Sequence, residues 1–244
     1  MISKLKEQLA IDLNCSKADF DKNENTVKIL CKNHSKRRNI EDDLIMFMAC
    51  FGKGTVVATC VEMEISMTKY VAKMDGFRCF DMPLDMLENE LKKYGGIISE
   101  IEEFYLLESD KIRQINTEFD VEILEGIAIK KLYEDNRFHM ALGNCQEQER
   151  KDMLAVVAYE NGEIVGVAGV SNDTDQIWQI GIDVVPEKRK HHVATDIVKI
   201  ISNEVLKRGK IPYYGTAWSN IASKRVAINA GYKPVWVEMK VKKI

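Results

Sequence analysis

The dipeptide Asn161-Gly162 constrains the fold of this chain more than any other feature, because it separates two runs of β-branched and apolar residues. These runs cover residues 153–160 and 163–170. Both central residues of a type I′ turn need a positive φ, which Asn and Gly adopt readily. The pattern predicts a β-hairpin, and residues 176–185 predict a third strand of the same sheet.

The stretch 182–201 predicts the end of a buried strand, a short basic turn and the start of a helix with apolar residues at helical spacing. The first turn of a helix leaves backbone N–H groups without intrahelical partners, and the macrodipole places partial positive charge there. Arg189, Lys190 and His191 add side-chain donors. We therefore expect a site for an anion such as phosphate or pyrophosphate.

The remaining C-terminal sequence predicts a helix over about 192–208, ending at Gly209, and a strand over 212–218 that pairs in parallel with the strand before the helix. Ser219 or Asn220 is a good N-cap for a helix that ends at Gly231, and residues 232–241 predict a last strand. Upstream of the hairpin we expect a short strand over 120–124 and helices over 127–140 and 145–151.

Residues 1–115 predict a smaller unit of their own. Helical spacing favours helices at 1–13 and 63–74, and a third that begins at Pro83, while 26–31, 55–60 and 97–107 favour strands. A chain of 244 residues is long enough for two cores. We expect an N-terminal α+β domain at 1–115, without a visible catalytic group, and a second domain at 116–244; His34 and His139 are interpreted as structural or exposed.

Composition limits the classes of partner. The formal net charge of −3 argues against a protein that grips nucleic acid over a broad surface, and the basic run 32–38 is expected to be a solvated loop. No apolar run approaches the length of a membrane span, and the N-terminus has no signal pattern, so a cytoplasmic location is expected. The six cysteines show no metal-ligand spacing, so no metal site is predicted and they are interpreted as free thiols.

Two motifs carry a resemblance to a known family. Arg189, His192 and Ala194 stand where the GNAT (GCN5-related) N-acetyltransferases have their Arg/Gln-x-x-Gly-x-Gly/Ala signature. Asn220 with Gly231-Tyr232 is similar to the Asn-x-x-Ala…Gly-Phe/Tyr pattern of the same family. The resemblance covers about residues 117–244 and implies an α+β fold with a mixed, mostly antiparallel twisted sheet flanked by helices. An additional N-terminal domain is similar to that of a clostridial-type subgroup.

The resemblance implies a binding site for acetyl-CoA. The pantetheine arm would lie along the strand ending at Val184, whose N–H would bond the thioester carbonyl. The pyrophosphate would lie on the amides that follow Arg189, with help from the Thr195 hydroxyl. The implied cofactor-binding residues are Val184, Val185, Arg189, Lys190, His191, His192, Val193, Ala194, Thr195, Asn220 and Ser223.

His192 departs from the family pattern, because it replaces the first glycine of the signature. We expect no glycine-like backbone angle there, since the first turn of a helix does not require one. The imidazole ring either contacts phosphate or points outward. His191 is expected to be exposed.

The catalytic groups are less well specified. Ala227 stands where family members commonly have the tyrosine that protonates the leaving thiolate, which leaves Tyr213, Tyr214, Tyr232 or water for that role. Asp183 is the only carboxylate on the strand before the signature turn. It is the candidate base, on the same strand face as Gln179 and Gly181. The alternative is a solvated residue or one that stabilises a turn.

The expected function is transfer of an acetyl group from acetyl-CoA to a primary amine of a small-molecule or peptide acceptor by direct attack. The alternatives are a non-catalytic acyl-CoA-binding sensor or regulatory module, and an interaction protein without a cofactor. No nucleic acid or membrane partner is expected. The N-terminal domain either forms one wall of the acceptor cleft or serves to form a homodimer.

Overall fold

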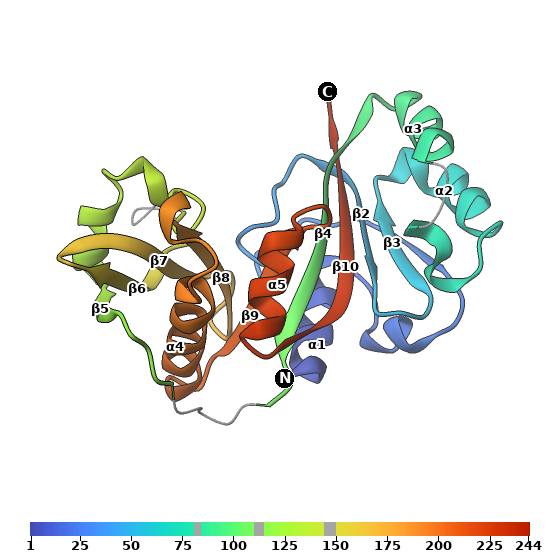
Figure 1. Ribbon diagram of the computed structural model, residues 1–244. Helices are drawn as coiled ribbons and strands as arrows, with labels where there is room; N and C mark the ends of the chain where they lie inside the picture. Colours follow the sequence, from blue (N-terminus) through green and yellow to red (C-terminus); the bar gives the residue numbers. More distant parts are fainter. Residues whose placement is uncertain (81–83, 110–114, 144–149) are drawn as a thin grey trace. The chain divides into compact units, whose positions relative to one another are not determined.

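The computed structural model of the chain describes residues 1–80, 84–109, 115–143 and 150–244 (Figure 1). Its elements form two compact units, one made of residues 1–104, 217–219 and 234–244, and the other of residues 105–216 and 220–233. The last strand, β10 (Tyr232–Lys243), therefore begins in the second unit and continues in the first. The expected two domains at 1–115 and 116–244 stay a prediction.

The first unit is built on strands in the order β1-β3-β2-β10-β4. The strands are β1 (Thr26–Ile29), β2 (Leu44–Cys50), β3 (Thr55–Thr59) and β4 (Gly96–Leu107), with β10 between β2 and β4. Strand β1 pairs in parallel with β3, whereas β2 is antiparallel to both β3 and β10. This arrangement makes β10 a central strand of the first unit.

Helices of the first unit cover the strands through two different cores. They are α1 (Ile2–Asp12), η1 (Lys17–Asp21), η2 (Val61–Met63), α2 (Glu64–Val71), η3 (Gly76–Phe80) and α3 (Leu84–Lys92). A methionine-rich cluster joins α2 and α3 to Met46, Met48 and Met239. Because strand residues alternate between faces, Phe47 and Trp236 lie on the other face, where Trp236 stacks on Phe104 with ring centroids 4.7 Å apart.

The second unit holds strands in the order β9-β8-β7-β6-β5. These are β5 (Asp120–Glu125), β6 (Asp152–Glu160), β7 (Glu163–Asn172), β8 (Ile177–Val184) and β9 (Ile211–Ala217). The predicted hairpin is confirmed, with φ of 53° at Asn161 and 82° at Gly162. Neighbouring strands are antiparallel except β8 and β9, which are parallel as predicted. The expected α+β class with a mostly antiparallel sheet is confirmed.

Two helices of the second unit follow the predicted positions. Helix α4 (Val193–Lys207) packs on β6, β7 and β8, and helix α5 (Ile221–Asn229) precedes β10 (Figure 1). Gly209, with φ of 70°, follows the end of α4 as expected. A short helix, η6 (Pro186–Lys188), precedes α4. The strand-turn-helix arrangement predicted for residues 182–201 is therefore present.

Some expectations are wrong or lie outside the described residues. Instead of an α-helix over 127–140, the chain forms the 3-10 helices η4 (Gly126–Leu132) and η5 (Asn136–Phe138), because the Asp135 side chain caps a new turn at the Arg137 amide. The basic run is not simply a solvated loop, since Arg37 is only 1% exposed. Pro83 and residues 145–149 of the expected helix at 145–151 lie outside the described residues.

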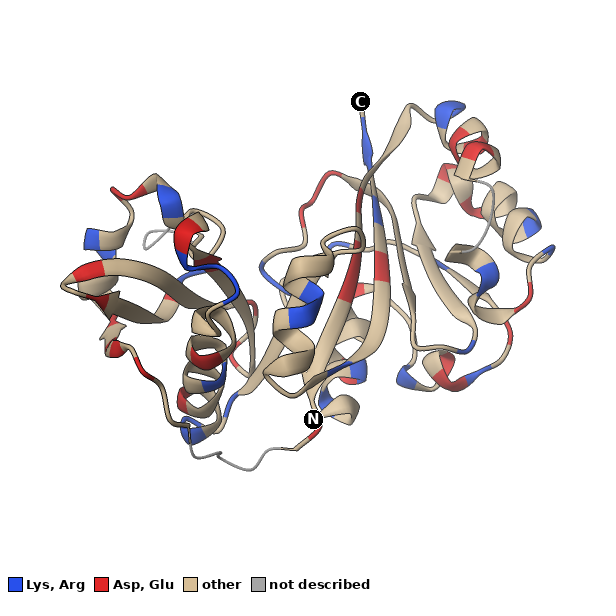
Figure 2. Ribbon diagram, in the orientation of Figure 1, with Lys and Arg blue, Asp and Glu red and all other residues tan. Residues whose placement is uncertain are grey.

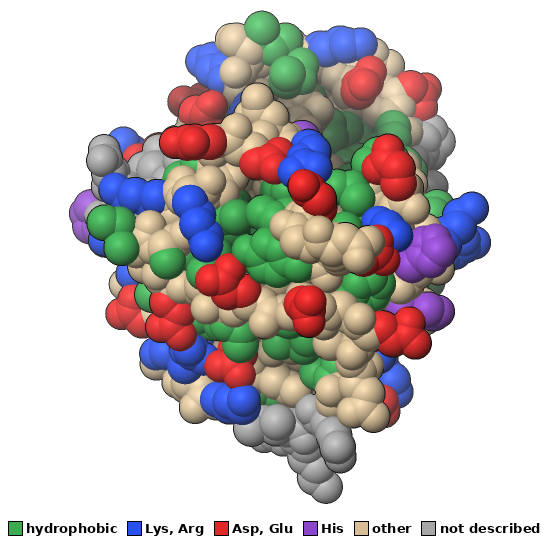
Figure 3. All heavy atoms as spheres, turned by 60° about the vertical axis from the view of Figure 1, so that its left-hand side comes forward, with side chains coloured by type: hydrophobic (Ala, Val, Ile, Leu, Met, Phe, Trp, Pro, Cys, Tyr) green, Lys and Arg blue, Asp and Glu red, His purple; other side chains and the backbone are tan. Residues whose placement is uncertain are grey.

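The surface mixes charges of both signs. Positions of Lys and Arg alternate with positions of Asp and Glu along the ribbons of both units (Figure 2). On the face drawn in Figure 3, histidine side chains lie beside lysine or arginine. His34 and His139 are exposed, and the cysteines among the described residues are free thiols. Within the described ranges, no helix combines the length and apolar character that a membrane span needs.

Candidate functional site

The candidate site begins where β8 and β9 stop pairing. Parallel pairing joins residues 177–180 of β8 to residues 211–214 of β9, and its last pair is Ile180 with Tyr214. Strand β8 continues to Val184 and β9 to Ala217. The last residues of β8 are therefore paired to β7 on one side, without described pairing to β9 on the other.

Backbone alternation fixes which way the amides at the end of β8 point. The Val185 N–H donates to the Val165 carbonyl at 3.0 Å, and Val184 lies opposite Gly166. In an antiparallel pair, hydrogen-bonded and non-hydrogen-bonded positions alternate. The N–H of Val184, and that of Ile182 two residues earlier, consequently point away from β7. These two N–H groups face the side of β8 on which the pairing with β9 has already ended.

The turn from β8 to α4 has an unusual backbone. Lys190 and His192 have φ of 72° and 62°, whereas Arg189 has φ of −66° and His191 is not among the residues with positive φ. The backbone at Arg189 is extended, with a ψ of 146°, so the left-handed residues Lys190 and His192 redirect the chain before it enters α4. The Arg189 Nε also donates to the Val184 carbonyl at 3.3 Å, which folds the arginine back over the end of β8.

Helix α4 begins directly after this turn. His192 is its N-cap residue in a left-handed conformation, and no side chain among the described residues caps the helix. The side chains of Val193 and Thr195 are buried, at 1% and 7% exposure, so they fix the helix start against the sheet. The first-turn N–H groups carry the partial positive end of the helix dipole. The predicted cofactor-binding residues from Val184 to Thr195 thus form one continuous segment of the second unit.

The expectation of an ordinary backbone angle at His192 is wrong. The residue lies before the first helical position, not inside the first turn, and there the chain needs a left-handed angle that favours glycine. Both His191 and His192 are exposed, which leaves both rings available to a ligand or to solvent.

Replacing His192 with glycine should raise the free energy of unfolding by up to about 1 kcal/mol, because it removes the strain of a left-handed non-glycine residue. Urea unfolding at constant pH measures this change. His191→Gly is the matched control, since its backbone needs no positive φ, and it should lower stability by roughly 0.5 to 1 kcal/mol. Equal effects of the two substitutions would contradict the strain at His192.

Asp183 lies on the face of β8 opposite Val184 and holds a neighbouring segment. Its Oδ2 accepts hydrogen bonds from the Met140 and Ala141 amides at 2.7 and 2.9 Å. Burial raises the pKa of Asp183 above its ordinary value, while these two bonds and the charges of His139 and Arg189 oppose the shift. The carboxylate thus stabilises a turn through one oxygen, which was one of the two interpretations of the sequence.

Asn220 and Ser223 have partners at the start of α5. The Asn220 side chain accepts a hydrogen bond from the Ser223 amide at 3.1 Å, so Asn220 is the predicted N-cap. The Ser223 hydroxyl lies 2.8 Å from the Tyr214 hydroxyl. Tyr214 is therefore joined to α5 at the point where β8 and β9 separate, and burial raises its pKa to about 12.

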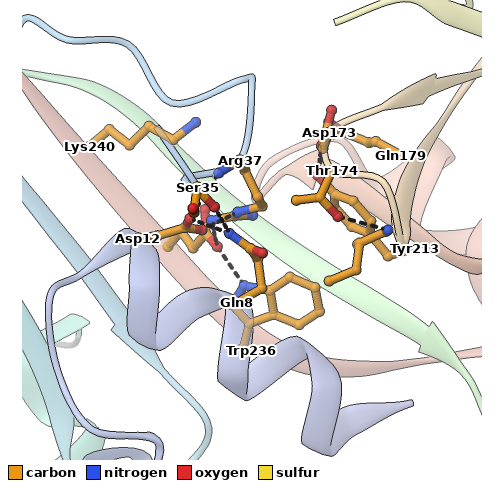
Figure 4. Close-up of polar contacts among 12 residues, drawn as sticks. Gln8, Asp12, Ser35, Arg37, Asp173, Thr174, Gln179, Tyr213, Trp236 and Lys240 are labelled. Atoms are coloured by element: carbon orange, nitrogen blue, oxygen red, sulfur yellow. Dashed lines mark hydrogen bonds and ion pairs between the residues drawn. The ribbon is translucent and has the colours of Figure 1, made fainter. Parts of the chain in front are cut away.

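The other candidate acids lie elsewhere in the second unit. The Tyr213 hydroxyl donates to Asp173 and lies 3.2 Å from Gln179 Oε1, and these side chains lie together in Figure 4. The Tyr232 hydroxyl lies 2.7 Å from the Ser202 hydroxyl within the core. Ala227 is fully buried. Tyr214 is hydrogen-bonded to Ser223, which is a residue of the predicted cofactor site.

Sequence reasoning missed the glycines that allow close packing around the site. A Cβ on Gly166 would lie 2.9 Å from Val193 Cγ1, and one on Gly169 would lie 2.2 Å from the Ala141 carbonyl oxygen. Gly166 therefore permits α4 to pack closely on β7, and Gly169 does the same for the segment held by Asp183. The sequence did contain an indication of this packing, because a glycine inside a strand often marks the close approach of another element.

Comparison with known proteins identifies the family. No curated protein is a significant match to the sequence. Among solved structures, the chain is similar to a GNAT-family protein from Novosphingobium aromaticivorans (12% identity, TM-score 0.48, 61% of this chain and 67% of the other). A GCN5-related N-acetyltransferase-like protein from Streptococcus suis gives 16% identity and a TM-score of 0.47 over 65% of this chain and 66% of the other.

AAC(6')-Iy in complex with the bisubstrate analogue CoA-S-monomethyl-acetylneamine gives 17% identity and a TM-score of 0.38 over 48% of this chain and 92% of the other. These similarities are too low to carry an argument about function. The sequence model of GNAT acetyltransferases, in contrast, matches residues 55–236, which is well over half of the chain. The chain therefore belongs to the GNAT acetyltransferase family.

Proposed function

We propose that this protein transfers an acetyl group from acetyl-CoA to a primary amine of a small-molecule or peptide acceptor. The observation that carries the proposal is the end of β8, where the Val184 amide faces away from β7 and the chain leads through the turn at Lys190 and His192 into the first turn of α4. Family membership makes acetyl transfer the expected reaction. The acceptor, a cytoplasmic location and a homodimer remain predictions.

The chemistry of the donor groups fits CoA. The pyrophosphate needs several N–H donors in a positive field, which the amides from Lys190 to Thr195 supply at the start of α4. Arg189 adds a guanidinium. The Thr195 hydroxyl would contribute less to binding than Arg189, because Thr195 is only 7% exposed. Asn220 and Ser223 would bind through groups that already have partners in α5 and Tyr214.

The proposed reaction is direct attack of the amine nitrogen on the thioester carbonyl carbon; the C–S bond then breaks, and CoA leaves as a thiolate that takes a proton from water. The Val184 N–H would donate to the carbonyl oxygen as negative charge develops on it, and a fixed amide needs little reorganisation. Holding both substrates in place supplies much of the remaining rate. The second oxygen of Asp183 is the proposed acceptor of the amine proton, and its raised pKa suits a base better than an ordinary aspartate.

One observation favours a second candidate, an acyl-CoA-binding module without catalysis. The position of the family's usual acid is Ala227, fully buried and unable to donate a proton. Tyr214, with its pKa raised to about 12, is a weak acid for that role. This alternative predicts binding of CoA without turnover.

Calorimetry with CoA tests the site. Arg189→Ala should weaken binding roughly tenfold, the loss expected for a hydrogen bond to a charged group, and Thr195→Val should weaken it less. Lys207→Ala is the matched control, since it removes a positive charge at the far end of the same helix. Unchanged affinity in both site variants would mean that CoA binds elsewhere.

Thiol release from acetyl-CoA across a panel of amines separates the two candidates. Asp183→Asn keeps an oxygen for the Met140 and Ala141 amides but removes the base. A fall in turnover of roughly a hundredfold or more would support proton transfer by Asp183, whereas unchanged turnover would assign Asp183 to holding the segment alone. Tight CoA binding without turnover of any amine would support the non-catalytic module.

A further inference from the structure

A group of buried charges crosses the first unit between α1, the segment around Arg37 and β10. The Arg37 Nε lies 2.5 Å from Asp12 Oδ2, and its Nη2 lies 2.7 Å from Glu238 Oε1. All three side chains are at most 1% exposed. Figure 4 shows Arg37 and Asp12 directed toward one another, with Gln8 beside them donating to Asp12 at 3.0 Å.

Glu238 uses only one of its two carboxylate oxygens in these contacts. Its Oε1 accepts from both Arg37 and the Trp236 Nε1, the latter at 2.7 Å. Its Oε2 is buried and has no hydrogen-bond partner among the residues that the structure describes. A buried carboxylate oxygen without a donor is costly, and native proteins rarely leave one. Glu238 is therefore prepared to accept one further donor.

The charges around Glu238 favour a positively charged donor. Lys240 Nζ lies 2.7 Å from Glu100 Oε2 and 3.9 Å from Glu102 Oε2. Asp12, Glu100, Glu102 and Glu238 are four carboxylates against the two cations Arg37 and Lys240, an excess of two negative charges among these six side chains.

The surroundings of Glu102 change its pKa. The pKa of Glu102 is raised to about 7, chiefly by burial and also by the charges of Glu238 and Glu100, whereas the charges of Lys240 and Arg37 lower it. Its side chain is still 25% exposed, and that of Glu100 is 40% exposed. A solute can therefore approach the negative group from the Glu100 and Glu102 side.

We propose that Glu102 and Glu238 form a binding site for the ammonium group of an organic amine. An ammonium carries three N–H donors on one compact charge, which can satisfy Glu238 Oε2 and Glu102 together. It also removes part of the negative excess. The site lies wholly in the first unit, and it stands independently of the CoA site and of the proposed acetyl transfer.

Calorimetry on the full chain without CoA tests the site, at pH 8 so that Glu102 is ionised. The probe is 1,4-diaminobutane, and butane-1,4-diol is its neutral counterpart of similar length. We expect the diamine to bind and the diol not to bind. Glu102→Gln should weaken diamine binding about tenfold. Glu88→Gln, the same change on the exposed surface of α3, should leave it unaltered.

Because Glu238→Gln alters a buried ion pair and can unfold the unit, the partly exposed Glu102 carries the test. If circular dichroism shows that the Glu238→Gln variant is folded, this variant should also bind the diamine more weakly. Absence of diamine binding, equal binding of the diol, unchanged affinity in Glu102→Gln, or binding of Mg²⁺ in place of the diamine would overturn the proposal. None of these results depends on acetyl transfer.

Discussion

Replacing Arg37 with alanine should lower the free energy of unfolding by about 3 to 5 kcal/mol, the loss expected when one member of a buried charge network is removed. Asp12 and Glu238 would then remain buried without the guanidinium that neutralises both. Urea unfolding followed by circular dichroism measures the difference.

Lys32→Ala is the matched control for Arg37, because it removes a positive charge from the same basic run at an exposed position. It should change stability by less than about 0.5 kcal/mol. A loss below 1 kcal/mol in Arg37→Ala would show that the two carboxylates are neutralised without the arginine. The buried network would then be a minor contributor to the first unit.

Gly169→Ala should lower stability by about 3 kcal/mol, at the upper end of what overpacking of a core usually costs. The added Cβ would lie 2.2 Å from the Ala141 carbonyl oxygen and 2.6 Å from Leu142 Cδ2. A backbone oxygen cannot move aside alone, so residues 140–142 must shift. The bonds from Met140 and Ala141 to Asp183 should lengthen or break as a consequence.

Gly143→Ala is the control for Gly169, since its Cβ would meet only ordinary contacts of 3.6 Å or more in the same segment. Thermal unfolding of both variants gives the comparison. If Gly169→Ala unfolds at the temperature of the unsubstituted protein, residues 140–142 do not pack on β7 as described. Exchange of the Met140 and Ala141 amide protons with solvent would then be as fast in the unsubstituted protein as in the variant.

Local sequence patterns predicted the second unit well. The Asn161-Gly162 turn, the strand that leads into α4 and the Asn220 cap each depend on residues within a few positions of one another. Such features follow from backbone preference and hydrophobic spacing alone. The same patterns placed the end of β8 next to an exposed helix terminus, and so indicated the candidate site.

Features that depend on distant residues could not be predicted. Arg37 is buried because its partner Glu238 lies 201 positions later in the chain. The left-handed angle at His192 arises because η6 and α4 must be joined over a short distance, which the composition of the turn does not reveal. Strand β2 was not predicted either, since its apolar run 44–50 lacks the alternation of a half-buried strand.

The path of β10 has a consequence for synthesis of the protein on the ribosome. Strand β2 has β3 on one side, but residues 237–242 of β10, which pair with its other side, follow the second unit in the sequence and are made later. Until those residues emerge, the inner edge of β2 has unpaired backbone groups, a state that is prone to association with other chains. The first unit can therefore finish folding only after the second unit has been translated. Nascent chains would need a chaperone most between the synthesis of β2 and the synthesis of β10.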